Sequence, residues 1–372
     1  MKSLRAADGY DFFLPGVRRT QVETYEIDDM VPQPFESLGI EDPDLLALLP
    51  LIPPSAIYGV RRMVTHFRET KVDVAYIWQD GAVLFAALAA LIAGVPRLVV
   101  SVRGLPPSMR AHLFHPAYEA MYRALARVPG VHFSTNSHAA AEAYGEWIGL
   151  ESSRLRVVYN GVLIPPRETS QRDIDRWSKF ERKTGGADVV TVGGVFRFDI
   201  DKRPSLWIDF AAAFLDRHPH ARMVLVGGGK MLPAAREKAA TLGIADRMLF
   251  VGTSDDVGFW LTKFDAFVLL SRYEGLPNVL VEAQQMGIPV VTTPAGGAAE
   301  ALVEGTSGLV LSSVEVVDVE ECCDKVENIL TWKKCDATVP ERIRSIANER
   351  FSTDRMIDRT VRLLAGAPLE GN

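Results

Sequence analysis

The sequence predicts an α/β protein of two Rossmann-like domains, each built on a parallel sheet. Its 372 residues exceed what one ordinary core holds, so two domains are expected. Short apolar runs alternate with helical stretches in two series, and this alternation indicates βαβ units. The polar segment 164–185 interrupts the alternation and is interpreted as the connection between the domains.

The first series predicts an N-terminal domain over residues 1–163. The apolar run 82–95 is too short to span a bilayer, so 82–93 is expected to be a buried helix. Residues 1–55 are acidic and rich in proline, which favours irregular structure with a short helix or two. The strands are expected at 72–78, 97–104, 131–137 and 154–162.

The second series predicts a C-terminal domain over residues 186–349, and the chain is expected to be helical after 315. Ligands of open parallel sheets bind at the carboxyl ends of the strands, so the loops that follow strands are the candidate sites. Strands are expected at 188–195, 221–229, 247–253, 264–271, 288–293 and 308–312, with helices at 204–217, 231–242 and 277–286.

Composition limits the function classes. A net charge of −6 argues against a nucleic-acid binder, because the field of the whole protein would repel phosphates. The three cysteines show no metal-ligand spacing and favour a reducing cytoplasm, and MKSLRAADGY lacks the apolar core of a signal peptide. A cytoplasmic location is therefore expected, with a peripheral position at the inner membrane face left open.

The stretch SRYEGLPNVLVEAQQMGIPVV (271–291) predicts a ligand site after a buried strand. Gly275 is expected to allow a sharp turn, Pro277 to start a helix, and the free N–H groups of 275–278 to bind an anion or a hydroxyl. Glu274 and Glu282 then suit vicinal hydroxyls at two places, a sugar ring and a ribose. Alternatively, Glu274 stabilises the helix end electrostatically and Glu282 is merely solvated.

The stretch VGGVFRFDIDKRP (192–204) follows the first strand of the second domain. Its glycines, Gly193 and Gly194, would let a ligand approach the backbone, and Arg197 with Lys202 would suit a diphosphate. Two solvated surface cations are the alternative. The turn LVGGGK (225–230) is not G-x-G-x-x-G, which disfavours a nicotinamide-dependent oxidoreductase.

Together with LFVGTSDD (249–256) and TTPAGGAAEAL (292–302), these stretches resemble the donor domain of retaining GT-B glycosyltransferases of glycosyltransferase family 4. The resemblance covers 188–312 strongly and 72–162 more weakly, and the family's E-x7-E motif falls on Glu274 and Glu282. It implies two Rossmann-like domains facing a central cleft. It also implies that the last helix, 350–366, completes the first domain.

By position, the resemblance implies a set of donor contacts. Arg197 and Lys202 would hold the diphosphate, Glu282 the ribose and Glu274 the transferred sugar. Transfer would retain anomeric configuration without metal or cofactor. The remaining donor-binding residues would be Gly194, Gly252, Thr253, Gly275, Leu276, Pro277 and Asn278.

The sequence departs from the family at two places. The strand ending LVVSVRG usually closes with histidine near the C6 end of the donor sugar, and here the residue is Arg103. We expect Arg103 to grip a uronic acid as a bidentate pair, with a plain structural arginine as the alternative. The family's opening strand and glycine-rich loop are not recognisable in residues 1–50, so the chain is expected to be a fragment or truncated.

The expected function is transfer of a sugar from a UDP-sugar to a growing bacterial surface polysaccharide or glycolipid. A more limited resemblance to the Vi-antigen type of capsular glycosyltransferase would imply an aminouronic acid donor. The alternative is a catalytically weak nucleotide-sugar or polysaccharide-binding partner in a larger complex. Arg110, Arg123 and Arg127 would face an anionic acceptor or an acidic membrane, or form a solvated helix face.

Overall fold

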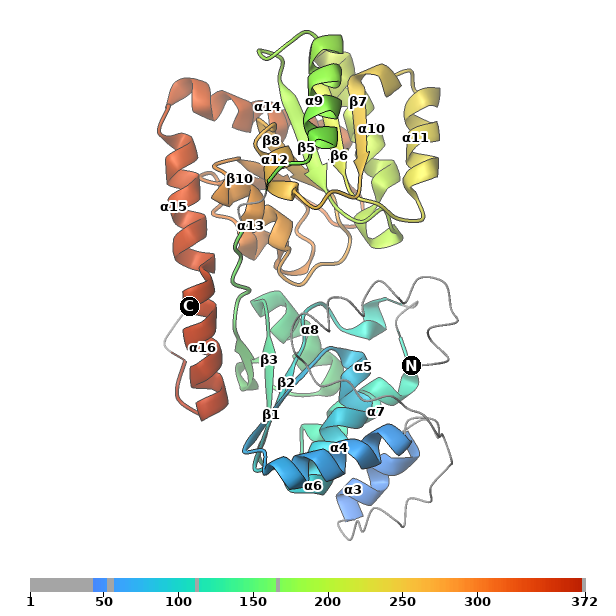
Figure 1. Cartoon of the computed structure of the whole chain (residues 1–372), viewed down its shortest axis with the longest axis vertical. Coiled ribbons are helices and arrows are strands. Elements are labelled where there is room, and N and C mark those ends of the chain that lie inside the picture. The colour runs from blue at the N-terminus through green and yellow to red at the C-terminus, as the bar shows by residue number, and fades with distance from the viewer. Residues whose placement is uncertain (1–42, 52–56, 111–113, 165–167, 370–372) are drawn as a thin grey trace. The chain divides into compact units, whose positions relative to one another are not determined.

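The computed structural model describes residues 43–51, 57–110, 114–164 and 168–369, and its chain divides into two compact units (Figure 1). Unit 1 comprises 1–102, 107–134 and 146–150, and unit 2 comprises 103–106, 135–145 and 151–372. Most of residues 1–55, including the region of the unrecognised opening strand, lies outside the described residues. No helix within the described ranges is long and apolar enough to cross a membrane.

A four-stranded parallel sheet, in the order β1-β2-β3-β4, follows the first series of predicted strands. The predicted buried helix over 82–93 is confirmed, with a π-helical turn, η4, inside it; Val83, Leu88 and Ala90 are fully buried. The elements are α3 (Pro43–Leu48), η2 (Leu49–Leu51), α4 (Ile57–Thr70), β1 (Val74–Trp78), α5 (Asp80–Ala82), η4 (Val83–Ala87), α6 (Leu88–Ala93), β2 (Arg97–Ser101), η5 (Pro107–Met109), α7 (Pro116–Leu125), β3 (Val131–Thr135), α8 (His138–Ile148), η6 (Ser152–Arg154) and β4 (Leu155–Val157).

A six-stranded parallel sheet forms the core of unit 2 in the order β10-β9-β8-β5-β6-β7. The predicted alternation of strands and helices is confirmed here. The elements are α9 (Gln171–Lys183), β5 (Thr191–Val195), η7 (Ile200–Lys202), α10 (Pro204–Arg217), β6 (Arg222–Val226), α11 (Leu232–Thr241), η8 (Ala245–Arg247), β7 (Met248–Gly252), α12 (Val257–Leu261), β8 (Ala266–Leu269), α13 (Asn278–Gln285), β9 (Val290–Thr292), η9 (Gly296–Ala301), β10 (Gly308–Val310), α14 (Val319–Cys335), α15 (Val339–Phe351) and α16 (Thr353–Ala365).

The strand order of unit 2 reverses direction between β7 and β8. The chain moves outward from β5 through β6 to β7, then crosses back to place β8 beside β5. Right-handed crossovers therefore put α10 and α11 on one face of the sheet and α13 on the other. The carboxyl ends of β5 and β8 form the switch point at which open sheets of this kind bind ligands.

The polar segment 164–185 does more than connect. Residues 171–183 form α9, which buries Trp177 and Phe180 in the core of unit 2; of its charged residues Asp173 is also buried, and most of the others face outward. The Arg222 guanidinium, only 2% exposed, lies over the Trp177 ring at 4.6 Å. The interpretation as a simple connection was wrong for these residues, because the apolar side of this helix is carried by two aromatic residues among many charges.

The glycines of β5 are required by packing inside the sheet. A Cβ on Gly193 would lie 2.3 Å from the Phe264 ring, and one on Gly194 would lie 3.1 Å from the Trp207 indole nitrogen. Protein therefore fills the space beside both residues. The prediction that a missing side chain at Gly193 and Gly194 admits a ligand is corrected accordingly.

We expect Gly193→Ala to destabilise unit 2 by about 1–3 kcal/mol, because the new methyl overpacks against Phe264. The measurement is urea unfolding followed by tryptophan fluorescence. Gly59→Ala is the matched control: it lies in α4 with no heavy atom within 4 Å of the new Cβ. That variant should be neutral or gain up to about 1 kcal/mol. An unchanged midpoint for Gly193→Ala would contradict the packing argument.

Candidate active site at the switch point of unit 2

Two loops meet at the switch point, one after β5 and one after β8. They are joined by an ion pair between the Lys202 ammonium and the Glu274 carboxylate. The Lys202 side chain is 16% exposed and that of Glu274 9% exposed, so the pair is largely shielded from water. The structure thus brings together two of the residues predicted for the donor site. For Lys202, the alternative of a solvated surface cation is not what the structure shows.

Arg203 fixes the geometry of both loops, and the sequence prediction missed it. Its backbone has φ 48°, a left-handed conformation that is uncommon for arginine. The guanidinium donates to the carbonyls of Leu270 (2.7 Å), Ser271 (2.8 Å) and Val314 (2.5 Å). The backbone N–H of Arg272 in turn donates to the carbonyl of Asp201 at 2.8 Å. The stretch DKRP contains these residues, but nothing local indicates that Arg203 bonds to backbone 67 residues away.

Arg197 lies on the same loop as Lys202 but is far more exposed. Its side chain is 78% exposed and forms an ion pair with Asp199 at 3.2 Å. Asp199 also accepts a hydrogen bond from the backbone N–H of Lys202, which shapes the turn η7. Arg197 is thus close to Lys202 along the chain, but its guanidinium group remains exposed to solvent.

Three glycines hold the backbone after Glu274 in close contact with neighbouring segments. A Cβ on Gly275 would lie 2.6 Å from the Arg103 carbonyl oxygen. Cβ atoms on Gly296 and Gly297 would lie 2.0 Å and 2.2 Å from the carbonyl oxygens of Glu274 and Gly275, respectively. Gly275 was predicted to permit a sharp turn; the chain bends there, and the backbone that passes beside it also requires glycine.

The N–H groups at the start of α13 face no internal acceptor. Within the part of the chain that the structure describes, the N–H groups of Gly275 and Leu276 donate to no backbone or side-chain atom. Helix α13 begins at Asn278, and Pro277 is its N-cap rather than its first residue as predicted. These N–H groups are suitable donors to an anion or a hydroxyl.

Gly252 and Thr253 lie against the glycine-rich turn that follows β6. The Gly252 carbonyl accepts a hydrogen bond from the N–H of Gly227 at 2.8 Å, and a Cβ on Gly228 would lie 3.0 Å from the Thr253 methyl group. The Phe198 N–H donates to the Gly228 carbonyl at 2.9 Å. The turn therefore links the loop after β7 to the loop after β5.

Glu282 lies within α13, and burial raises the pKa of its carboxyl group. Among the described residues, no cation or hydrogen-bond donor contacts this carboxyl group. A carboxyl group that is partly buried without a partner is costly to keep charged, unless a ligand supplies hydrogen-bond donors.

Arg103 is connected through Asn160 to Leu276 and Asn278, at the start of α13. The Arg103 guanidinium donates to the Asn160 side-chain oxygen at 3.0 Å. The Asn160 amide in turn donates to the Leu276 carbonyl at 3.2 Å and to the Asn278 side-chain oxygen at 2.7 Å. Asn160 was missed because the stretch VVYNGV gives no local sign of these partners.

Glu300 is a third residue that the prediction did not single out. Its carboxylate accepts hydrogen bonds from the N–H groups of His138 and Ala139, both at 2.8 Å, and from the Tyr159 hydroxyl at 3.1 Å. Burial, and then this carboxylate, raise the pKa of Tyr159 to about 12. The Arg350 guanidinium also donates to the Glu300 carbonyl at 2.8 Å. Glu300 thereby fixes the start of α8 against η9.

The basic segment after β2 is partly neutralised by its own contacts. Arg123 on α7 pairs with Glu119 at 3.0 Å and donates to the Trp147 carbonyl at 2.9 Å. For Arg123, this pairing favours a solvated helix face over a surface that binds an anionic acceptor or an acidic membrane.

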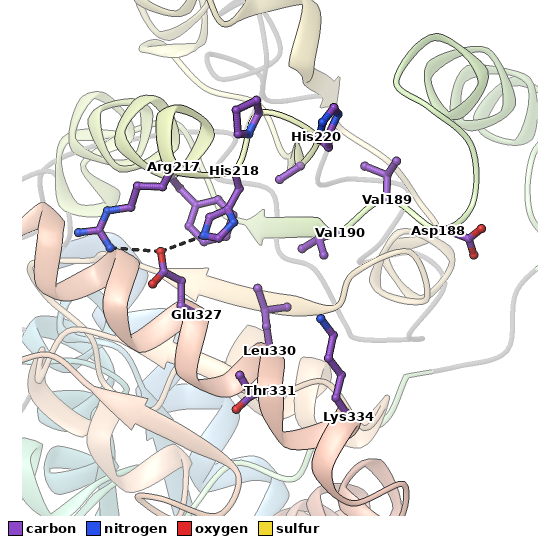
Figure 2. A pocket seen from close by; sticks show the side chains of 13 residues that line it. Asp188, Val189, Val190, Arg217, His218, His220, Glu327, Leu330, Thr331 and Lys334 are labelled. Atoms are coloured by element: carbon purple, nitrogen blue, oxygen red, sulfur yellow. Dashed lines mark hydrogen bonds and ion pairs between the residues drawn. The ribbon is translucent and has the colours of Figure 1, made fainter.

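A cavity of about 580 Å³ lies away from the predicted donor residues, at the amino ends of β5 and β6 (Figure 2). Figure 2 shows Glu327 between Arg217 and His218, with contacts of 3.2 Å and 2.9 Å. The hydrogen bond from His218 is the main cause of the lowered pKa of Glu327. These contacts join α10 to α14, at the edge of the sheet opposite to the Lys202–Glu274 pair.

Family models account for most of the chain. The model of group 1 glycosyl transferases matches residues 173–345, and that of Glycosyltransferase Family 4 matches residues 17–163. The chain belongs to the family 4 glycosyltransferases. The resemblance inferred from the motifs is thus confirmed, and the two parallel sheets are those of the GT-B fold.

Relatives of this glycosyltransferase-family chain include proteins of surface-polysaccharide synthesis. It is 46% identical over 369 residues to the Vi polysaccharide biosynthesis protein VipC/TviE of Salmonella typhi, covering 99% of this chain and 64% of that protein. It is 30% identical over 152 residues to the lipopolysaccharide core biosynthesis glycosyltransferase LpsE of Rhizobium meliloti, covering 41% of this chain and 44% of that protein. The matches thus span less than two thirds of either relative.

A solved structure with the same fold contains a nucleotide. HepE of Anabaena, crystallised with UDP, superposes with a TM-score of 0.70 at 25% identity, covering 82% of each chain.

The raised pKa of Glu282 predicts a pH-dependent stability. Because its folded-state pKa lies above the unfolded value of about 4.3, the charged form destabilises the fold as pH rises above that value. We expect Glu282→Gln to raise the unfolding temperature at neutral pH and to lose this gain as pH falls through the folded-state pKa towards the unfolded value. The control is Glu237→Gln on the exposed side of α11, which should show no such trend. Equal behaviour of the two variants would contradict the burial argument.

Proposed function

We propose that this chain is a retaining, metal-independent glycosyltransferase. It would move a sugar from a UDP-sugar to a growing bacterial surface polysaccharide or glycolipid. The observation that carries the proposal is the pairing of Lys202 with Glu274 at the switch point of unit 2, beside the N–H groups of Gly275 and Leu276, which have no acceptor among the described residues. The relatives in polysaccharide synthesis and the UDP complex of HepE support the same class of substrate.

The proposed diphosphate contacts use charges already present at the switch point. An ammonium group has three N–H donors, so Lys202 can keep its bond to Glu274 and donate to a phosphate oxygen as well. Arg197 would exchange its exposed pair with Asp199 for the diphosphate at small cost, because exposed ion pairs contribute only about 0–1 kcal/mol. Both cations would stabilise the negative charge that develops on the leaving UDP.

The two carboxylates are proposed to bind hydroxyl groups. Glu274 would accept hydrogen bonds from the transferred sugar, and Glu282 from the ribose, while the N–H groups from Gly275 to Asn278 assist at sugar and phosphate. Gly252 and Thr253 would line the nucleotide side. With no protein base assigned, the leaving phosphate would accept the proton of the attacking acceptor hydroxyl, so that the new glycosidic bond forms as the bond to UDP breaks.

Arg103 is proposed to select a donor with a carboxylate at C6, a uronic or aminouronic acid. Its guanidinium shares one N–H with Asn160 and is thereby oriented next to the loop of Leu276 and Asn278. A planar guanidinium suits a carboxylate better than a histidine ring would.

The test of donor binding compares UDP with 2′-deoxy-UDP by calorimetry. In the natural protein, the loss of the ribose 2′-hydroxyl should weaken binding about tenfold or more, since a charged hydrogen bond contributes about 1.5–3 kcal/mol. In Glu282→Gln the two nucleotides should bind with nearly equal affinity, and Glu237→Gln should behave like the natural protein. Equal affinities for both nucleotides in the natural protein would contradict the role of Glu282. Binding of UDP-sugars without transfer or hydrolysis would favour the catalytically weak binding partner instead.

The test of donor choice is Arg103→His. We expect the preference for UDP-glucuronate over UDP-glucose, measured as a ratio of kcat/KM, to fall by about tenfold or more, because the bidentate contact is lost. An unchanged ratio would remove Arg103 from the specificity argument.

A further inference from the structure

The carboxyl end of β1 in unit 1 presents an aromatic ring to solvent. Trp78 is the last residue of β1 and is 45% exposed, although the strand residues Ala75 and Ile77 are buried. Its ring is held at 5.3 Å from that of Tyr76 in an edge-to-face contact. An indole fixed in this way is a rigid apolar surface with a polar N–H, and such rings are favoured at binding surfaces.

The backbone directly after Trp78 is strained. Gln79 has φ 72° and ψ 144°, a region that residues other than glycine rarely adopt. Its N–H donates to the Ser101 carbonyl at the end of β2 at 3.2 Å, and a π-helical turn, η4, follows within a few residues. Both features cluster at functional sites in proteins, because packing alone would favour a relaxed turn.

The strained turn places a carboxylate among polar groups of α7. The Asp80 carboxylate accepts a hydrogen bond from the Tyr122 hydroxyl at 2.8 Å. Burial, and then the charge of Asp80, raise the pKa of the nearby Tyr118 hydroxyl, so this phenol stays protonated and remains a donor. A Cβ on Gly81 would lie 3.9 Å from that hydroxyl, so the turn and the phenol are neighbours.

His115 adds a further donor beside Tyr118. Its Nδ1 accepts the N–H of Ala117 at 3.2 Å, so a neutral ring carries its proton on Nε2. The ring is exposed and contacts Tyr118 at 5.7 Å between centroids.

We infer that Trp78, Asp80, Tyr118 and His115 form a subsite for one uncharged pyranose ring of the acceptor glycan. The apolar C–H face of the sugar would lie on the Trp78 indole, its hydroxyls would donate to Asp80, and its oxygens would accept from Tyr118 and His115. The Asp80 charge disfavours a uronate at this position, so the subsite distinguishes a neutral acceptor residue from the anionic sugar proposed for the donor. This inference rests on the proposed function.

The experiment uses the full chain labelled with 5-fluorotryptophan, in which Trp78→Phe assigns the Trp78 fluorine resonance. Methyl glucoside, methyl N-acetylglucosaminide and methyl glucuronide are added at about 10 mM, a range suited to weak sugar binding. We expect the two neutral glycosides to shift the Trp78 resonance and the glucuronide to leave it unchanged. Absence of a shift with every neutral glycoside, or an equal shift with the glucuronide, would overturn the inference.

Variants separate this subsite from the donor site. Trp78→Ala should abolish saturation transfer from the protein to the neutral glycosides, and Asp80→Asn should weaken it at least fivefold. Trp78→Phe should retain part of it, and Asp73→Asn, an exposed carboxylate just before the opposite end of β1, should retain all of it. UDP affinity should be unchanged in all four variants. Undiminished glycoside binding in Trp78→Ala contradicts the subsite, whereas failure of UDP to bind the natural protein contradicts the donor proposal instead.

Discussion

The ion pair between Lys202 and Glu274 is the interaction on which the candidate site depends. It joins the loop after β5 to the loop after β8, at the point where the strand order of unit 2 reverses. Removing either partner would leave a shielded charge without compensation, which costs far more than the loss of an exposed pair. The hydrogen bonds of Arg203 to Leu270 and Ser271 brace the same two loops, so that charge and backbone geometry are fixed together.

Glu282 illustrates how a binding site can be locally unfavourable for the fold. A carboxyl group in α13 with no partner among the described residues opposes its own ionisation, and glutamine or an apolar residue would make the fold more stable. In the proposed function, ribose hydroxyls provide the missing donors. The free energy that the fold gives up at this position is then recovered on binding, a common relation between stability and activity.

The sequence could predict the sheets well because apolar runs, glycine and proline act locally. The strands around 191–195 and 266–269, and the helix from 278, follow directly from such signals. Helix α9 was not predicted because its apolar face consists of two aromatic residues within a highly charged segment.

The candidate site was predictable only where a motif marks it. Glu274 and Lys202 were identified, and the structure brings them into contact. Asn160, Arg203 and Glu300 were not, because each acts through partners 50 or more residues away along the chain. The glycines show the same limit of sequence prediction. Gly193 and Gly275 could be recognised as special, but the segments that each one contacts are decided by the tertiary structure.

The tight contact of Gly296 and Gly297 with the carbonyls of Glu274 and Gly275 has a consequence for how this scaffold can change. Main-chain segments touch there without intervening side chains, so neither an added methyl group nor a one-residue insertion could be accommodated by a local shift. Engineering a new sugar preference should therefore exchange functional groups such as Arg103 around an unaltered main chain, and libraries that vary loop length at 274–276 or 295–297 should yield few folded members.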